Sequence, residues 1–133
     1  FSSCLLTGET LHVFGDGEQT RDYVYVGDVV KANLFASDLS LEGGGDLDDF
    51  AFNIGTGVAT SVNCLADALE KVSGIHSGRS FESPRPGELQ HSTLDISRIR
   101  DRGWNQEVDL EEGLARTFGW IADQDRASSG VLT

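Results

Sequence analysis

The segment from Ser61 to Gly74 constrains most tightly how this chain can fold. Its apolar residues recur at spacings of three and four, which is the pattern of one face of an amphipathic helix. They are Val62, Leu65, Ala66, Leu69 and Val72. Ser61 is a favoured N-cap residue, and Gly74 can adopt the left-handed backbone that ends many helices. We therefore predict a helix over residues 61–74 whose apolar face packs on a sheet.

Short strand candidates alternate with further helix candidates along the chain. The predicted strands cover residues 10–14, 22–26 and 50–54, and the other predicted helices run from Asp28 to Ser37, from Asp95 to Gly103 and from Asp109 onward. A turn over residues 15–20 would make the first two strands a hairpin-like unit. This alternation predicts an α/β fold, in which so few strands need neighbours from elsewhere to complete a sheet.

Capping residues and apolar spacing indicate how these helices begin and which faces they bury. Asp28 is predicted as an N-cap, and Asp109 with Glu112 forms an acidic capping box. The helix after Asp28 has two alternative core faces, one with Val30, Leu34 and Ala36 and the other with Ala32 and Phe35. The last helix has a single apolar face, formed by Leu110, Leu114, Phe118 and Ile121. We expect a solvated loop over residues 41–49, one partial domain over 1–125 and a disordered tail over 126–133.

The charge balance argues against some classes of partner. The 133 residues carry 22 acidic and 10 basic side chains, for a net charge of -12. Nucleic acids and anionic membranes need a basic face, so we expect neither as a partner. The acidic surface is interpreted as general solubility, with adaptation to a high-salt cytoplasm as the alternative. No apolar run is long enough to span a membrane, and we expect a soluble, cytoplasmic protein.

The cysteines and histidines do not form a metal-binding pattern. Cys4 and Cys64 lie far apart, and His12, His76 and His91 are scattered, so we predict no metal site. Cys64 falls among apolar helix positions and is interpreted as a reduced thiol in the core. The sequence contains no methionine, and we expect it to be part of a longer or processed protein.

The stretch GTGVAT over residues 55–60 matches a dinucleotide-binding loop only in part. Two glycines of the G-x-G-x-x-G pattern are present, but the third is missing. The pattern also requires an acidic residue at the end of a second strand roughly 20 residues later, and a helix end occupies that region here. We therefore do not interpret this stretch as the main cofactor loop.

Two arginines lie in turns that restrict their backbone. Arg21 follows GDGEQT, and Arg85 lies between two prolines in SPRPGE. Arginine presents a planar fork of donors that matches phosphate oxygens, and a rigid turn reduces the entropy lost on holding it. Two such arginines would suit a diphosphate. The alternative is that both form ordinary surface ion pairs with acidic neighbours, which are Glu18 or Asp22 for the first and Glu88 for the second.

Four motifs in order resemble the C-terminal half of the extended short-chain dehydrogenases, in the NAD-dependent epimerase/dehydratase family. They are GDGEQTRDYVYVGDVV, FNIGTG, PRPGE and DISRIRDRGW. The chain looks closest to members similar to UDP-glucose 4-epimerase. The resemblance implies the substrate-binding lobe of a Rossmann-type fold, with a late strand and helix of the Rossmann sheet, in a parent protein that forms a homodimer.

The resemblance also implies which residues bind a nucleotide-diphosphate sugar. Arg21 and Arg85 match the family's diphosphate-binding arginines. Glu88 matches an acidic position that accepts hydrogen bonds from ribose hydroxyls. The strand from His12 to Phe14 matches the strand that flanks the base, so both of these residues are candidate contacts.

Other family features bear on the chemistry. Asn53 matches a position that helps to hold phosphate, and the alternative is that it caps a strand end through backbone hydrogen bonds. In that family the N-terminal half binds NAD, which transiently takes a hydride from sugar C4, and carries a catalytic Tyr-x-x-x-Lys pair. Tyr23 and Tyr25 are the only tyrosines here, and Gly27 and Val29 stand four residues after them. We therefore expect no catalytic residue in this chain.

Several alternatives stay open at this point. The reaction could be 4,6-dehydration or decarboxylation, as in dTDP-glucose 4,6-dehydratases and UDP-glucuronate decarboxylases. The parent could be a regulatory relative that binds a dinucleotide or a sugar nucleotide without turnover. The resemblance could also extend to the scaffold alone, with an interaction role for the acidic surface. Binding of UDP-sugars distinguishes the scaffold alternative from the rest.

Overall fold

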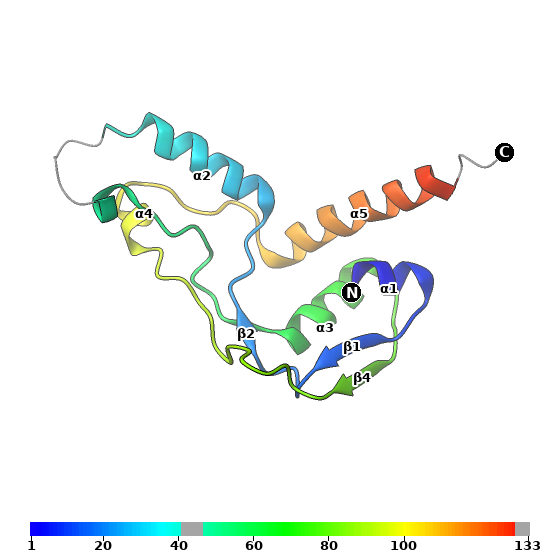
Figure 1. Cartoon of the computed structure of the whole chain (residues 1–133). Coiled ribbons are helices and arrows are strands. Elements are labelled where there is room, and N and C mark those ends of the chain that lie inside the picture. The colour runs from blue at the N-terminus through cyan, green and yellow to red at the C-terminus, as the bar shows by residue number, and fades with distance from the viewer. Residues whose placement is uncertain (41–46, 130–133) are drawn as a thin grey trace.

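The computed structural model describes residues 1–40 and 47–129 and contains two short sheets with helices around them (Figure 1). The helices are α1 (Ser2–Thr7), α2 (Val26–Asp38), α3 (Val62–Ser73), α4 (Ser97–Asp101) and α5 (Leu110–Ser129), with a short 3-10 helix, η1 (Leu47–Phe50). The strands are β1 (Leu11–Phe14), β2 (Thr20–Arg21), β3 (Thr60–Ser61) and β4 (Arg79–Glu82). Within the described ranges, no helix is long and apolar enough to cross a membrane.

Each sheet joins two strands that are distant in sequence. Strand β1 runs parallel to β4, with Phe14 opposite Glu82, and β2 runs antiparallel to β3, with Arg21 opposite Thr60. The strand predicted over residues 10–14 is confirmed, but the predicted hairpin is wrong, because both β1 and β2 pair with segments from later in the chain.

The first core cluster lies among β1, α1, α3 and α5. Its buried residues are Leu5, Leu11, Ala66 and Leu69, and Val72, Leu114 and Phe118 pack against them. The apolar face predicted for α3 is therefore a core face, and so is the face of α5 that carries Leu114 and Phe118. Helices α3 and α5 pack on each other, and Figure 1 shows the β1–β4 pair beside α3 and α1.

The second core cluster lies beside α2 and α4, at the other side of the molecule in Figure 1. Its buried residues are Ala32, Ile96, Ile99 and Trp104, and Phe35, Phe52 and Ile54 pack against them. Of the two faces predicted for the helix at residues 28–37, the one with Ala32 and Phe35 is the core face. Val30 and Leu34 are 55% and 64% exposed.

The caps of α3 and α5 match the sequence prediction. The Ser61 side chain accepts a hydrogen bond from the backbone N–H of Cys64 at 3.1 Å, and Gly74 ends α3 with a φ of 69°. Asp109 accepts from the backbone N–H of Glu112 at 2.8 Å. The interpretation of Cys64 as a core thiol is wrong, because this residue is exposed. It lies two positions from Ala66, which places it roughly on the opposite side of the helix.

Residues 22–26 do not form the predicted strand. Tyr23 and Tyr25 lie half-buried in an irregular segment, and α2 begins at Val26. Asp28 is therefore not the N-cap but lies buried in the first turn of α2. Its carboxylate accepts hydrogen bonds from the backbone N–H groups of residues 107 and 108, at 3.1 and 2.9 Å. The Asp28 carboxylate therefore binds a segment distant in sequence and not the backbone N–H groups at the start of its own helix.

The other irregular segments also differ in part from the prediction. Residues 50–54 form no strand, and Phe52 and Ile54 pack on the second core cluster from a loop. Most of the predicted solvated loop, residues 41–46, lies outside the described residues. Helix α5 continues to Ser129, so residues 126–129 are helical where the sequence predicts a disordered tail. Residues 130–133 again lie outside the description, and the domain boundary at 125 stays a prediction.

Candidate functional site

The turn after β1 is held in place by the start of α3. Gly15 and Gly17 have φ angles of 73° and 77°, which glycine adopts readily. The Asn63 side-chain amide donates to the carbonyl of Asp16 at 2.9 Å and to the carboxylate of Glu18 at 2.7 Å. A Cβ on Gly17 would lie 2.3 Å from Asn63 Oδ1, so the close approach requires glycine at that position. These contacts fix the backbone conformation of the turn that precedes Arg21.

Arg21 is half-buried and has three hydrogen-bond partners. Its Nη1 donates to the carbonyls of Thr20 and Leu89, at 2.7 and 2.8 Å. Its Nη2 lies 3.1 Å from Oε1 of Glu88. The ion pair predicted with Glu18 or Asp22 is therefore not the one that forms. Burial raises the pKa of the nearby Tyr23 hydroxyl, and the positive charge of Arg21 opposes that shift.

Arg85 lies in a second turn and covers an aromatic ring. Its guanidinium carbon is 3.8 Å from the centroid of the Phe14 ring, a cation–π geometry. The turn closes through a hydrogen bond from the Glu88 N–H to the Arg85 carbonyl at 3.2 Å, with Gly87 at a φ of 77°. Arg85 itself is exposed. Glu88, the expected surface partner of Arg85, binds Arg21 instead.

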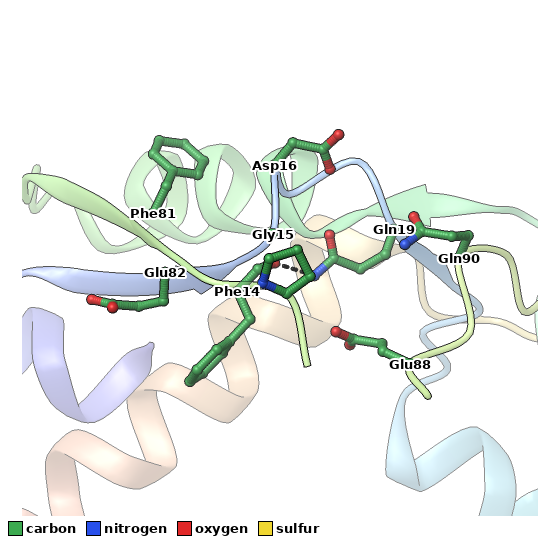
Figure 2. Close-up of a pocket in the computed structure, with 9 residues that line it drawn as sticks. Phe14, Gly15, Asp16, Gln19, Phe81, Glu82, Glu88 and Gln90 are labelled. Atoms are coloured by element: carbon green, nitrogen blue, oxygen red, sulfur yellow. Dashed lines mark hydrogen bonds between the residues drawn. The ribbon is translucent and has the colours of Figure 1, made fainter. Parts of the chain in front are cut away.

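A hollow of about 550 Å³ lies between these two turns (Figure 2). It is lined by Phe14, Gly15, Asp16, Gln19, Phe81, Glu82, Pro84, Glu88 and Gln90. The side-chain amide of the buried Gln19 donates to the Phe14 carbonyl at 2.8 Å, which joins the end of the turn to the end of β1. Phe14 contacts Arg85 and Glu88 contacts Arg21, so the partners of both arginines border the same hollow.

His12 and Asn53 occupy different surroundings. His12 lies two residues before Phe14 on β1, where its Nδ1 is 2.9 Å from Ser80 Oγ and 3.3 Å from Glu82 Oε1. Asn53 donates to the carbonyl of Asp95 at 3.1 Å, beside the second core cluster. Asn53 thus makes a backbone hydrogen bond, as its alternative role requires, but residues 50–54 form no strand whose end it could cap. The structure thus places Glu88 beside Arg21 and Phe14 beside Arg85, with Glu88 and Phe14 both lining the hollow. His12 lies near Phe14 on β1, and Asn53 is joined to another segment.

Asp22 makes long-range contacts that the sequence does not predict. Its carboxylate accepts hydrogen bonds from Thr56, Gly57 and Leu94, although none of these is close to it in sequence. Burial alone would raise the pKa of Asp22, but the hydrogen bonds from those three residues outweigh burial and lower it. In the sequence, only its position directly after Arg21 marks this aspartate, and that position suggests an ion pair with the arginine.

Metal ligation is not supported by the described part of the chain. Over residues 1–40 and 47–129, no group of three or more His, Cys, Asp or Glu side chains is arranged to hold a metal ion. The polar groups that line the hollow are carboxylates and amides, beside the ring of Phe14.

Comparisons with known proteins match this architecture. The model of the NAD dependent epimerase/dehydratase family matches residues 1–55. The UDP-glucose 4-epimerase of Mycolicibacterium smegmatis is 45% identical over 127 residues, which cover 95% of this chain and 39% of that protein.

Solved structures align over nearly the whole chain. The structure of UDP-glucose 4-epimerase with UDP-glucose from Thermotoga maritima is 40% identical, with a TM-score of 0.81, over 92% of this chain and 38% of that one. UDP-glucuronic acid 4-epimerase from Bacillus cereus, in complex with UDP-glucuronic acid and NAD, is 28% identical, with a TM-score of 0.82 and the same coverage.

The chain thus spans about two fifths of the length of the relatives that it matches. Its α/β fold is that of part of a Rossmann-type epimerase, as the sequence predicts. The family model, the sequence identity and the structural alignment agree: the chain belongs to the NAD-dependent epimerase/dehydratase family.

Proposed function

We propose that this chain forms the sugar-nucleotide-binding part of an NAD-dependent 4-epimerase whose substrate is a UDP-sugar. The observation that carries the proposal is that Arg21 contacts Glu88 and Arg85 contacts Phe14, and that both of these partners line one hollow although the two arginines are distant in sequence. Two arginine forks at one site match the oxygens of a diphosphate, and arginine binds such groups through paired hydrogen bonds. Relatives solved with UDP-glucose and UDP-glucuronic acid support a UDP-sugar as the ligand.

The other residues at the hollow have roles that fit the same ligand. Glu88 holds Arg21 in this structure, and in the proposed complex its carboxylate accepts hydrogen bonds from ribose hydroxyls while the diphosphate binds the arginine. The Phe14 ring and the exposed edge of β1 at His12 flank the base. Asn53 has the weakest support as a phosphate contact, because its amide donates to the Asp95 carbonyl.

We also propose that NAD is held by other parts of the protein. The glycines at positions 55 and 57 are followed by strand β3, so α3 does not begin directly after them as it does in a dinucleotide-binding loop. Their backbone also faces Asp22, and a carboxylate does not suit a pyrophosphate cradle. When bound, NAD would accept a hydride from the sugar. The residues of this chain would orient the sugar by holding its nucleotide, which contributes to turnover at a distant carbon.

The assembly and location of the protein rest on the family resemblance. We propose a homodimer in the cytoplasm, with no catalytic residue supplied by this chain. Dehydration or decarboxylation of a nucleotide sugar would use the same diphosphate site, so a product assay on the whole protein with UDP-glucose is needed to identify the reaction.

The proposed function is tested by titrating the whole protein with UDP-glucose, UDP, UMP and uridine in a calorimeter. We expect binding that depends on the diphosphate, with UDP at least about tenfold tighter than UMP, because UMP cannot engage both arginines. Equal affinity for UDP and uridine, or no binding of any of the four, would contradict the proposal and favour a scaffold role.

A further inference from the structure

The carboxylate of Asp22 joins three segments that are distant in sequence. Its Oδ1 accepts from the backbone N–H of Thr56 at 2.7 Å and from the Thr56 hydroxyl at 2.6 Å. Its Oδ2 accepts from the N–H of Gly57 at 2.9 Å and from that of Leu94 at 3.4 Å. The loop at residues 55–57 and the segment that leads to α4 are therefore both attached to the residue next to Arg21.

The backbone at Arg21 needs such support. Strands β2 and β3 pair over only two residues each, and so short a pairing is weak by itself. On its other side, Thr20 exchanges backbone hydrogen bonds with Gln90 and Ser92, at 2.8 and 3.2 Å. Asp22 extends both contacts beyond the end of β2, because its carboxylate reaches the loop that precedes β3 and the chain that follows residue 92. The backbone at residues 20–21 thus pairs with β3 on one side and with residues 90–92 on the other, and Asp22 binds the continuation of both segments.

The glycines of the GTG stretch are explained by the same contact. A Cβ on Gly55 would lie 2.6 Å from Asp22 Oδ2, so glycine is required for the carboxylate to approach. Gly57 has a φ of 73° and points its N–H at the same carboxylate. Thr56 adds a hydroxyl donor, and its backbone carbonyl accepts from Arg100 at 3.1 Å. The GTG stretch, which partly matches a dinucleotide-binding loop, instead donates hydrogen bonds to the Asp22 carboxylate.

The hydrogen bonds to Asp22 also keep its carboxylate from pairing with the neighbouring Arg21. Because Thr56, Gly57 and Leu94 satisfy the Asp22 carboxylate, the guanidinium of Arg21 is turned to Glu88 and the Leu89 carbonyl instead. A free aspartate next to Arg21 would compete with a phosphate for its donors. The contact with the 55–57 loop thus both fixes the backbone at Arg21 and separates the two opposite charges.

We propose that Asp22, with Thr56 as its principal partner, is a positioning residue that sets the conformation of Arg21 for the diphosphate. Asp22 itself touches no part of the ligand in this proposal. The inference rests on the proposed function, because it assumes that Arg21 binds the diphosphate. It adds a residue and a loop to which the family resemblance assigns no role in substrate binding.

The test measures UDP binding by calorimetry to the whole protein and its variants. Asp22→Asn replaces one carboxylate oxygen with an amide that cannot accept from an N–H, and we expect UDP binding to weaken about tenfold. Thr56→Val should weaken it severalfold, and Thr56→Ser, which keeps the hydroxyl, should restore it. Asp109→Asn is the matched control, because Asp109 also accepts a backbone hydrogen bond, from the N–H of Glu112 at 2.8 Å, but lies at the start of α5.

A double-mutant cycle separates positioning from general loss of structure. In an Arg21→Ala background, Asp22→Asn should change UDP affinity less than about twofold, because the residue acts through Arg21. An equal loss in both backgrounds, or wild-type affinity in Asp22→Asn, would overturn the inference. If Asp22→Asn does not fold, the comparison of Thr56→Val with Thr56→Ser decides, and equal affinities of these two variants would also overturn it. Wild-type affinity in Arg21→Ala alone would instead reject the proposed function.

Discussion

The guanidinium of Arg21 lies 3.1 Å from the carboxylate of Glu88, although 67 positions separate the two residues in the sequence. Arg85, in the turn that leads to Glu88, lies on the ring of Phe14 at 3.8 Å. The guanidinium of Arg21 therefore binds a carboxylate, and that of Arg85 binds an aromatic ring. A bound diphosphate would have to replace these contacts, and this exchange leads to the first prediction.

Glu88→Gln should separate binding of phosphate from binding of ribose. Removing the carboxylate frees Arg21 and takes away one negative charge, so affinity for inorganic pyrophosphate should rise by up to about fivefold, the usual scale of a partly exposed ion pair. Affinity for UDP should fall relative to pyrophosphate, because the charged acceptor for the ribose hydroxyls is lost. Calorimetry with both ligands measures this, and a parallel change for the two would contradict the assigned role of Glu88.

Gly17→Ala should destabilise the protein more than Gly8→Ala. Both glycines have positive φ angles, of 77° and 74°, so both substitutions cost about 1–2 kcal/mol in backbone strain. A Cβ at position 8 meets nothing within 4 Å, whereas one at position 17 would clash with Asn63. We expect an additional loss of about 1–3 kcal/mol for Gly17→Ala in urea unfolding of the whole protein. Equal losses would mean that Asn63 moves aside freely.

Acid should weaken the contact made by Asp22. Its pKa is lowered in the folded protein by the hydrogen bonds that it accepts, despite the opposing effect of burial. The unfolded chain then binds more protons in the acidic range, so this contribution to stability is present at neutral pH and is lost as the pH falls below about 5. Urea unfolding of wild type and Asp22→Asn at several pH values measures it. The stability difference between them should shrink from pH 7 to pH 3, and a constant difference would contradict the account.

The isolated 133-residue chain should be inactive and prone to associate. It has no Tyr-x-x-x-Lys pair, so no turnover of UDP-glucose with NAD is expected. Val30 and Leu34 lie exposed on one side of α2, which favours association. Leu34→Lys should reduce association in light scattering, and Leu89→Lys, at a similarly exposed leucine away from this helix, serves as the control. Detectable turnover, or a monomeric chain with a sharp reversible melt, would contradict the prediction.

Local signals in the sequence predicted the helices better than the strands. The Ser61 cap, the apolar spacing of α3 and the Gly74 stop are all encoded within a few residues, and all are confirmed. The alternation at Tyr23 and Tyr25 suggested a strand, but these side chains border the first turns of α5 from an irregular segment. Asp28 looked like a cap because the residue type is right, whereas its partners are nearly 80 positions away. Strand pairing and long-range hydrogen bonds such as those of Asp28 depend on tertiary structure, which short sequence patterns do not encode.

The candidate site shows the same limit. The turn chemistry around Arg21 and Arg85 marked both as unusual, and the family resemblance suggested a shared ligand. Their actual partners, Glu88 and Phe14, could not be chosen from spacing, because nearer acids were available to both arginines. Asp22 was missed as an organising residue because its donors are mostly backbone N–H groups, which carry no sequence signature.

In the proposed function, Arg21 and Arg85 hold one diphosphate. A charge-assisted contact to phosphate is worth about 1.5–3 kcal/mol, so Arg21→Ala and Arg85→Ala should each weaken UDP binding on the order of tenfold to a hundredfold. Lysine at either position should recover only part of the loss, because it lacks the bidentate fork. Arg98→Ala is the matched control, since this exposed arginine also lies over a phenylalanine, 5.8 Å from the centroid of the Phe52 ring, but on α4, away from the hollow.

The most direct measurement is calorimetry of UDP and NAD with the whole protein, the two single alanine variants and the double variant. We predict weakened UDP binding in both singles, a non-additive double and little change in NAD affinity. Wild-type UDP affinity in both singles would contradict the claim and return both arginines to a structural role. An equal loss of UDP and NAD affinity would show that the substitutions disrupt the fold rather than the site.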